Sequence, residues 1–328
     1  MQKPNIFKYA TSELSQDAII CYILEWAKIE NKKENEQLHS LAINFIDSLF
    51  EKFADITKPL KYEKIDIKKQ YENIDVLCII NDQYSIIIED KTNTKNHSNQ
   101  LERYFDKVKV NFSNTEILPI YFKTGDQSNY DNVIENNYKL YQREDLLKIL
   151  KSHITNNNIL DDYTNYLQDI DNSIKSYQIL PITKWHYNSW KGFFIELRKM
   201  LNDGNWDYVS NARGGFLGFW WNWNSNDEYH IYLQIDHNIE KITFKLYTKT
   251  DKKIEKSIIN KWKKIIAYDK DGLIVKKPKV VRTGKSVTIG ILENEFRMTN
   301  DDGIIDMDKT IDFIHKIEDI KIEKFKSI

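Results

Sequence analysis

The stretch NIDVLCIINDQYSIIIEDK, residues 73–91, contains two apolar runs separated by the turn-forming triplet Asn81-Asp82-Gln83. Short apolar runs on either side of such a triplet are typical of a buried β-hairpin. Each run has acidic residues at its outer end. The sequence therefore predicts a buried hairpin whose open end is charged.

The register of this hairpin decides which side chains meet. If the loop has three residues, Ile80 pairs with Tyr84 and, counting outward, Asp75 lies opposite Glu89. Directly opposed residues share a face, with Cβ atoms about 4.5–5.5 Å apart. Lys91 lies on the same face because strand side chains alternate. A two-residue loop would instead separate the two carboxylates.

Two carboxylates this close repel each other, and burial strengthens the repulsion. A shared proton, the neighbouring Lys91 or a divalent cation would offset it. Mg²⁺ is commonly held by one or two carboxylates together with water and substrate phosphate oxygens. Lys91 would then position or polarise a water, or stabilise charge that develops on a scissile phosphate. These residues predict a metal-assisted phosphodiester hydrolase.

At these residues the chain resembles the PD-(D/E)XK nuclease superfamily, whose signature is an acidic residue, a short hairpin and then acid-x-Lys. Asp75 corresponds to the first acid and Glu89-Asp90-Lys91 to E-x-K, while Ile74 stands where the family name has proline. The resemblance implies that Asp75, Glu89 and the backbone carbonyl of Asp90 hold Mg²⁺ or Mn²⁺. It also implies that Lys91 orients or activates the attacking water.

The spacing of apolar residues predicts a helix over residues 11–29, with Thr11 or Ser12 as its N-cap. Its start, ELSQDA, resembles the first helix of one group in the superfamily, in which a glutamate approaches the metal. This resemblance adds Glu13 to the expected metal ligands, and Asp17 is a further candidate. An acidic residue in the first turn is also explained by the helix dipole alone.

A second helix that bears on the site is predicted over residues 100–110, one polar loop after E-x-K. Gln100, Arg103 or Tyr104, and Lys107 share one face of it. Gln100 and Tyr104 also match the Q-h-x-x-Y motif of the RecB-like branch of the superfamily, where both lie near the site. We expect Gln100 to support catalysis and Tyr104, Arg103 and Lys107 to contact the substrate.

The predicted elements of the first half follow the order helix, three strands, helix, strand. The strands are expected at residues 60–67, in the hairpin and at 117–122, and a last one at 138–141. This order gives the restriction-endonuclease-like α-βββ-α-β core of the superfamily, a mixed sheet flanked by helices in an α/β, overall α+β, protein. Pro181 in QILPIT marks the expected boundary between a nuclease-like domain, residues 1–178, and an accessory domain, residues 179–328.

The accessory domain is predicted to be a Trp-rich α+β module whose role the sequence does not specify, with substrate recognition and dimerisation as the two candidates. Arg213-Gly214-Gly215 and the three tryptophans between residues 220 and 223 would suit base stacking. Packing inside a twisted sheet is the commoner use of such aromatics and the one that we favour. Lys276-Lys277-Pro278-Lys279 with Arg282 forms a basic cluster that either contacts phosphates or solvates a loop.

The composition limits the class of protein. The net charge is −1, so any phosphate-binding surface must be local. Cys21 and Cys78 fit neither a zinc motif nor a disulfide framework and predict reduced thiols in the cytoplasm. Residues 1–30 show no signal peptide, and no apolar run approaches the roughly 20 residues of a membrane span. We expect a soluble cytoplasmic protein without membrane contacts.

The expected partner is nucleic acid, DNA rather than RNA, and a homodimer is compatible with the sequence. A rival hypothesis is a non-catalytic nucleic-acid-binding or assembly protein that retains the nuclease fold. In that protein the acid and lysine residues would form only a buried charge network. The presence of Asp75, Glu89 and Lys91 together argues against it.

Overall fold

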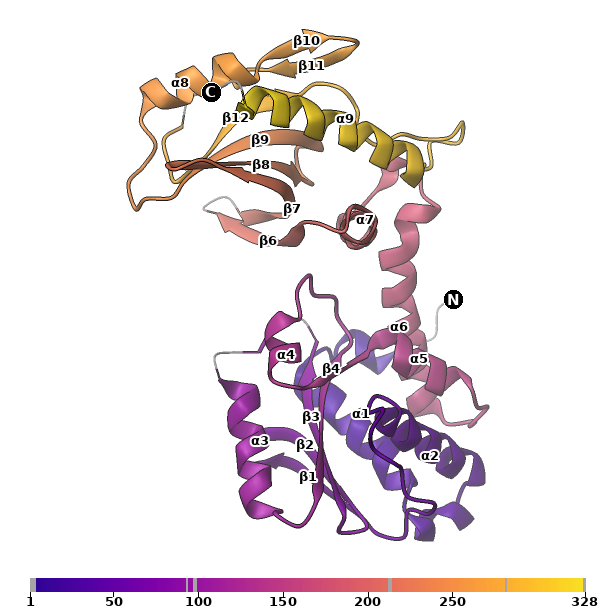
Figure 1. Ribbon diagram of the computed structural model, residues 1–328. Helices are drawn as coiled ribbons and strands as arrows, with labels where there is room; N and C mark the ends of the chain where they lie inside the picture. Colours follow the sequence, from indigo (N-terminus) through magenta and orange to yellow (C-terminus); the bar gives the residue numbers. More distant parts are fainter. Residues whose placement is uncertain (1–3, 93, 97–98, 212–213, 281, 327–328) are drawn as a thin grey trace. The chain divides into compact units, whose positions relative to one another are not determined.

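The computed structural model describes residues 4–92, 94–96, 99–211, 214–280 and 282–326. The chain divides into two compact units, Met1–Asp171 and Asn172–Ile328, which are described separately (Figure 1). The division lies within helix α6 (Asn158–Lys175), a few residues before the boundary expected after residue 178.

The first unit is built on a mixed five-stranded sheet in the order β1-β2-β3-β4-β5. β1, β2 and β3 are antiparallel neighbours, whereas β4 and β5 run parallel to β3. This confirms the mixed sheet with helices that the sequence predicts. The strands are β1 (Ile65–Tyr71), β2 (Ile74–Ile80), β3 (Tyr84–Lys91), β4 (Glu116–Lys123) and β5 (Lys139–Gln142).

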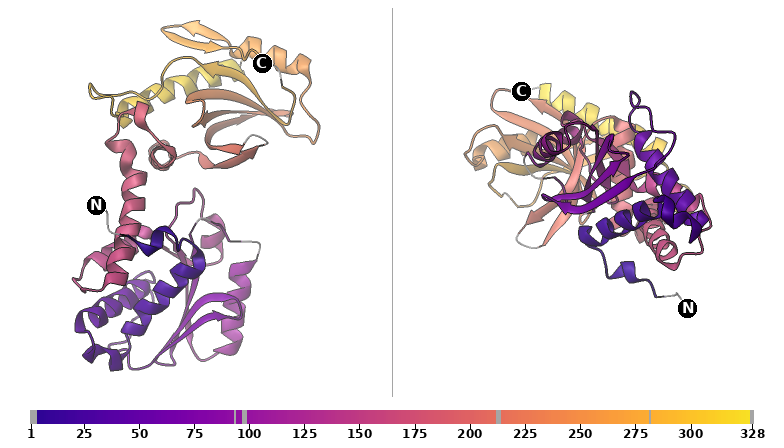
Figure 2. Two further views of the ribbon diagram at one scale, coloured as in Figure 1. Left: turned by 180° about the vertical axis from the view of Figure 1, so that it is seen from behind. Right: turned by 90° about the horizontal axis from the view of Figure 1, so that it is seen from below.

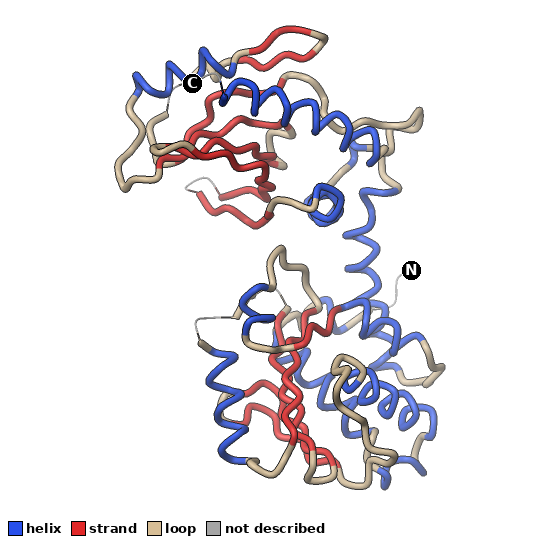
Figure 3. Tube along the Cα trace, viewed as in Figure 1, coloured by secondary structure: helices blue, strands red, loops and turns tan. Residues whose placement is uncertain are grey.

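Helices cover both faces of this sheet (Figures 1 and 3). The helices are α1 (Glu13–Trp26), α2 (Glu36–Phe50), α3 (Gln100–Asn111), α4 (Asp131–Glu135), α5 (Arg143–Lys151) and α6, with 3₁₀ helices η1 (Ile6–Lys8) and η2 (Ile29–Lys33). Ser12 is the N-cap of α1 and accepts from the Ser15 amide at 3.3 Å. The strand expected at residues 60–67 begins only at Ile65, since Leu60 is fully exposed.

Alternation along β2 and β3 sends their apolar side chains to two different cores. Val76 and Ile88 belong to the core that includes α1 and α2 residues. Leu77 and Ile87 belong to the core that includes Leu101 of α3. Figure 2 shows from behind that α3 lies on one side of the sheet and α1 and α2 lie on the other. From Val76 to Ile80 and from Ile86 to Ile88, successive residues therefore alternate between the α1 side and the α3 side, whereas Ile74 lies on the α3 side with Leu77.

The second unit contains a seven-stranded sheet in the order β10-β11-β12-β9-β8-β7-β6, with all neighbours antiparallel. Its strands are β6 (Asn205–Asn211), β7 (Gly214–Ser225), β8 (Tyr229–Asp236), β9 (Lys241–Thr248), β10 (Tyr268–Lys270), β11 (Leu273–Lys276) and β12 (Ser286–Leu292). Its helices are α7 (Tyr187–Leu201), α8 (Lys256–Ile266) and α9 (Met307–Lys326), with η3 (Ser176–Gln178) and η4 (Ile182–Lys184).

Most tryptophans of the second unit lie in its core, as packing in a twisted sheet requires. Trp190, Trp206, Trp221 and Trp262 are each at most 5% exposed and share one cluster with residues of the three helices. Trp223 is different, since it is 45% exposed. Arg213, part of the stacking hypothesis, lies outside the described residues.

Gly192 of α7 lies against the end of α6, and its lack of a side chain allows this approach. A Cβ there would lie 1.9 Å from the carbonyl oxygen of Ile174. We expect Gly192→Ala to lower the free energy of unfolding by a net amount of about 1–2 kcal/mol, because overpacking outweighs the better helix propensity of alanine. Urea unfolding followed by tryptophan fluorescence measures this.

Gly284→Ala is the matched control, because the nearest atom to its Cβ would lie at an ordinary 3.4 Å. We expect no loss of stability in that variant. Unchanged stability of Gly192→Ala would contradict the close packing of α6 on α7.

None of the helices in the part of the chain that the structure describes is long and apolar enough to cross a membrane.

Candidate active site at the open end of the hairpin

The hairpin has the register that brings the two acids of the motif together. Ile80 pairs with Tyr84, and the pairing continues without a shift to Val76 opposite Ile88. The ladder ends at that pair, one residue before Asp75 on β2 and Glu89 on β3. The loop is closed by Asn81 and Asp82 at φ of 53° and 54°, a region that Asn and Asp adopt more readily than other non-glycine residues.

Lys91 connects the two carboxylates. Its Nζ donates to Glu89 Oε1, donates to the Asp90 carbonyl oxygen at 3.0 Å and lies 3.7 Å from Asp75 Oδ2. Asp75 Oδ2 also accepts from the Asp90 amide at 2.9 Å. Lys91 therefore contacts Glu89 and the Asp90 carbonyl and lies near Asp75, so one ammonium joins both carboxylates of the motif.

Helix α3 contributes a side chain that contacts Glu89. Gln100 Nε2 donates to Glu89 Oε1 at 2.7 Å and to Tyr104 Oη at 3.1 Å. Tyr138 Oη donates to the Leu101 carbonyl at 3.0 Å and anchors the first turn of the helix. Gln100 and Tyr104 thus lie at the site, one turn apart as their motif spacing requires.

Burial makes this cluster electrostatically strained. Glu89 is fully buried, and burial, followed by the charge of Asp75, raises its pKa to about 8, although Lys91 acts in the opposite direction. Burial alone would lower the pKa of Lys91, but Glu89 and Asp75 outweigh it and the net shift is upward. The upward shift of the Lys91 pKa shows that the nearby carboxylates outweigh the effect of burial.

One carboxylate oxygen of the cluster lacks a hydrogen-bond partner. Among the described residues, Glu89 Oε2 is buried without a hydrogen-bond partner, which is costly for a carboxylate. Asp75 has an 18% exposed side chain, so this edge of the cluster is open to solvent. A hard divalent cation fits this donor set, since it prefers carboxylate, carbonyl and water oxygens. Asp75, Glu89 and the Asp90 carbonyl would hold it.

These protein groups are too few to fill the coordination sphere of a metal ion by themselves. In the part of the chain that the structure describes, no group of three or more His, Cys, Asp and Glu side chains is arranged to hold a metal ion. A Mg²⁺ site need not contain one, because this ion usually keeps several waters and binds substrate phosphates.

The Asp90 side chain points to the opposite face of the sheet and meets α1. Its Oδ1 accepts from Gln16 Nε2, and Gln16 Oε1 in turn accepts from Tyr163 Oη at 3.2 Å. Gln70 Nε2 donates to both Asp17, at 3.0 Å, and Asp75, at 3.2 Å. Gln16 and Gln70, which sequence reasoning missed, therefore position Asp90 and Asp75.

Asp17 lies in this second network and not in the cluster around Glu89. Burial, followed by the charge of Asp75, raises its pKa to about 6. Its side chain is almost completely buried, at 1% exposure. Asp17 and Asp75 thus share Gln70 as a hydrogen-bond donor, and the further role considered for Asp17 stays a prediction.

Lys123 at the end of β4 is a second cation that the sequence analysis missed. It pairs in register with Lys91 on the adjacent parallel strand, and its Nζ donates to the Thr94 carbonyl at 2.5 Å. Burial lowers its pKa to about 8. The signal in the sequence is a lysine that ends an apolar strand, but its proximity to Lys91 depends on strand order.

The other three predicted residues make their hydrogen bonds elsewhere, although the charge of Glu13 acts on Glu89 and Lys91. Glu13 Oε1 accepts from the Thr92 amide at 3.2 Å and from Thr94 Oγ1 at 2.5 Å, so it holds the segment after β3. Lys107 Nζ donates to the Glu72 carbonyl at 2.9 Å. Arg103 is exposed on α3. The expected ligand role of Glu13 and the substrate roles of Lys107 and Arg103 stay predictions.

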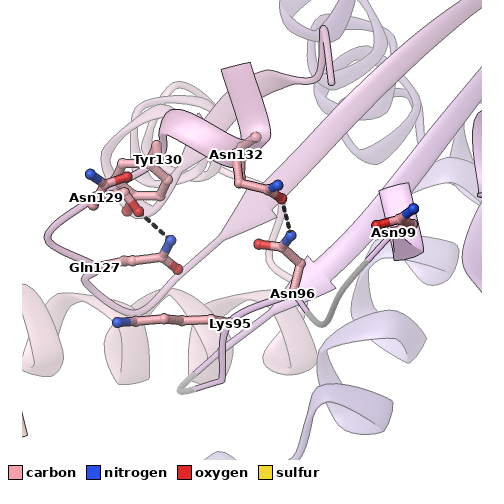
Figure 4. A pocket seen from close by; sticks show the side chains of 8 residues that line it. Lys95, Asn96, Asn99, Gln127, Asn129, Tyr130 and Asn132 are labelled. Atoms are coloured by element: carbon pink, nitrogen blue, oxygen red, sulfur yellow. Dashed lines mark hydrogen bonds between the residues drawn. The ribbon is translucent and has the colours of Figure 1, made fainter. Parts of the chain in front are cut away.

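A polar pocket lies at the same end of the first unit (Figure 4). It has a volume of about 410 Å³ and lies between the segment before α3 and the segment around α4. Figure 4 shows Asn96 and Asn132 joined by a hydrogen bond and the side chains of Gln127 and Asn129 nearby. Its lining is Lys95, Asn96, Asn99, Gln127, Asn129, Tyr130, Asn132 and Val133.

Comparison with known proteins adds one match. A family model described as the PD-(D/E)XK nuclease superfamily matches residues 4–185, more than half of the 328 residues of the chain. The matched range includes the hairpin and helices α1 to α6, and so all the residues of the site. Neither the curated proteins nor the solved structures contain a match to the chain.

Proposed function

Because the chain belongs to the PD-(D/E)XK nuclease superfamily, we propose that it is a Mg²⁺- or Mn²⁺-dependent nuclease that hydrolyses phosphodiester bonds of DNA. The observation that supports this proposal best is the buried, unpartnered Glu89 Oε2 next to Asp75 and Lys91. Asp17 Oδ1 and Asp90 Oδ2 are also buried without a partner, so it is the contact of Glu89 with Lys91, itself 3.7 Å from Asp75, that distinguishes this oxygen.

In this proposal each residue of the site has a separate role in catalysis. Asp75, Glu89 and the Asp90 carbonyl bind the cation, which when bound supplies Lewis-acid polarisation of the phosphate and lowers the pKa of a water. Lys91 donates hydrogen bonds to the attacking water or to the phosphate oxygens, where negative charge grows in the transition state. Its contacts with Glu89 and Asp75 keep this ammonium charged.

Gln100 has a positioning role in this scheme. Its amide already holds Glu89 Oε1 at 2.7 Å, so Oε2 is the oxygen that remains for a cation. Tyr104 in turn accepts from Gln100 and fixes the amide orientation. Tyr104, Arg103 and Lys107, all on α3, are proposed to contact the substrate backbone, and Glu13 to approach the cation from α1.

Incubation with nucleic acid tests the proposal directly. We expect the protein to cleave DNA with Mg²⁺ or Mn²⁺ and to be inactive in EDTA, since the cation supplies several kcal/mol of transition-state stabilisation. Gel electrophoresis of supercoiled DNA, single-stranded DNA and RNA measures cleavage. Cleavage of RNA alone would replace the DNA assignment.

Failure to cleave any of these substrates, together with failure to bind Mn²⁺ in calorimetry, would favour the rival protein that only binds or assembles. Restriction, repair or defence against mobile DNA is the setting that we propose for a nuclease of this superfamily. A homodimer is part of the same proposal, and light scattering measures it.

A further inference from the structure

The two faces of the sheet in the second unit differ in chemistry. On β8, Ile231, Leu233 and Ile235 face the helical core. The alternate residues of β8 and their partners on β9 therefore lie on the other face, and they are mostly aromatic or polar. They include His230, Tyr232, Gln234, Thr243, Lys245 and Tyr247.

An irregularity in β7 adds a tryptophan to this outer face. Trp221 belongs to the core, so regular alternation would send Trp223 to the core as well. Instead the register shifts between Trp221 and Asn224, with Asn222 at a left-handed φ of 56°. This bulge turns Trp223 to the outer face, where it stacks on Tyr232 at 4.0 Å between ring centroids and 12° between planes.

The stacked pair forms a fixed aromatic platform. Tyr232 is only 7% exposed, whereas Trp223 is 45% exposed although one of its faces contacts Tyr232. His230 and Tyr247 contact the Trp223 ring at steep angles, with centroids 5.7 Å and 6.5 Å away. The exposed face of Trp223 is therefore held in a fixed orientation in which a flat ring can stack on it.

A basic groove adjoins the platform. It has a volume of about 710 Å³, and its lining contains Lys245, Lys276, Lys277, Lys279 and Arg282. Glu293, which lies 3.3 Å from Lys276, is the one carboxylate among the described residues that line it. The net charge of the groove is therefore strongly positive in a chain whose total charge is −1.

The platform and the groove are continuous through neighbouring strands. Tyr232 pairs in register with Lys245, whose Nζ donates to Thr288 Oγ1 at 3.2 Å. The Tyr232 hydroxyl also lies 2.9 Å from Ser286 Oγ, at the rim of the groove. Burial lowers the pKa of Lys245, so an anion next to it would be stabilised more than at a fully solvated lysine.

We propose that this outer face binds single-stranded nucleic acid, with an unpaired base stacked on Trp223 and the adjoining phosphates in the basic groove. A strand with unpaired bases matches both features, because every base offers a π-face and every linkage a negative charge. A duplex offers only the charge, since its base faces are stacked inside. This inference deepens the proposed function by naming a substrate feature, but it does not need cleavage to be tested.

Binding is measured in EDTA by fluorescence anisotropy with a labelled 20-nucleotide single strand, using the full chain. We expect Trp223→Ala to weaken binding roughly 5- to 150-fold, the range for removal of one base–aromatic stack. Tyr187→Ala is the matched control: Tyr187 is a similarly exposed aromatic, at 41%, on α7. It should bind like the unmodified protein.

The groove is tested by a second variant that leaves the bulge intact. Lys277→Gln with Lys279→Gln should lower the slope of log affinity against log salt by about 0.7 for each phosphate that the variant no longer neutralises. Lys199→Gln with Lys309→Gln removes two exposed lysines on α7 and α9 and should leave the slope unchanged. Single-stranded DNA and RNA are compared to identify the sugar.

Two outcomes would overturn this inference. One is unchanged binding in Trp223→Ala and in the groove variant. The other is duplex DNA bound as tightly as a single strand, with no effect of Trp223→Ala. Either result leaves the proposed nuclease intact if divalent-dependent cleavage occurs, and loss of cleavage alone leaves the binding result intact.

Discussion

Asp75→Asn and Lys91→Met are each expected to lower divalent-dependent cleavage by about 10³-fold or more without unfolding the protein. The size of this fall in rate follows from the several kcal/mol of transition-state stabilisation that a metal ion or a correctly placed charge contributes. Asp75→Asn removes a charge that contacts Lys91 and repels Glu89. Cleavage rates under single-turnover conditions, with circular dichroism as the fold readout, measure both variants.

The fold should survive because Asp75 is partly exposed and because Lys91→Met removes a buried charge whose partner can take up a proton. In Asp75→Asn the carboxamide can still accept from the Asp90 amide, which lies 2.9 Å from Asp75 Oδ2. In Lys91→Met, Glu89 loses its ammonium partner and, being fully buried, will hold its proton to higher pH. A protonated carboxyl is tolerated in such a site but cannot bind a cation.

The hairpin contains its own control at the opposite end. Asp82 and Lys64 form an ion pair at 2.8 Å with side chains 66% and 62% exposed. Asp82→Asn and Lys64→Met make the same chemical changes on an exposed pair, which contributes little to stability, and should leave cleavage unchanged. Cleavage that persists in both Asp75→Asn and Lys91→Met would refute the site.

The central part of this site follows from local sequence rules. Two apolar runs and a three-residue loop predict the hairpin register up to Val76 and Ile88. The shared face of Asp75, Glu89 and Lys91 is a prediction from that register, and the contacts of Lys91 with both carboxylates agree with it. Helical spacing then explains why Gln100 and Tyr104 face the same point. These inferences need only the periods of strands and helices, so they did not depend on knowing the fold.

The residues that sequence reasoning missed are those brought in by distant elements. Gln16 contacts Asp90 across 74 positions, and Lys123 lies beside Lys91 only because β4 is the parallel neighbour of β3. Gln70 reaches Asp75 and Asp17 from a left-handed conformation with φ of 55°. No local periodicity specifies such contacts.

Two features of the second unit also could not be predicted from local sequence patterns. Alternation along β7 would assign Trp223 to the core, and the bulge at Asn222 reverses this assignment. The hairpin of β10 and β11 was also missed, because strands of three and four residues are too short for an alternating pattern to be recognised.

Mn²⁺ affinity is expected to rise about tenfold per pH unit between about pH 6 and 8 and to level off above that range. Burial, and then Asp75, raise the pKa of Glu89 to about 8, so at pH 7 most molecules hold a proton on this carboxyl. The cation needs the carboxylate and must displace that proton. Calorimetry in buffers of different ionisation enthalpy should detect release of about one proton per ion at pH 6–7.

Glu89→Gln is the informative variant, because it removes both the carboxylate and its proton. It should bind Mn²⁺ more weakly, with an affinity that no longer changes steeply from pH 6 to 8. Without metal, the stability of the fold changes with pH in the opposite direction to the metal affinity. Because the pKa of Glu89 is raised, the folded state holds an extra proton at pH values above 4.5, the pKa in the unfolded state. The free energy of unfolding therefore falls as the pH rises toward 8. Glu89→Gln should remove that fall. If the affinity of the unmodified protein were flat across this range, Glu89 would not be the ligand whose proton the cation displaces, and the assignment of its unpartnered oxygen to the metal would fail.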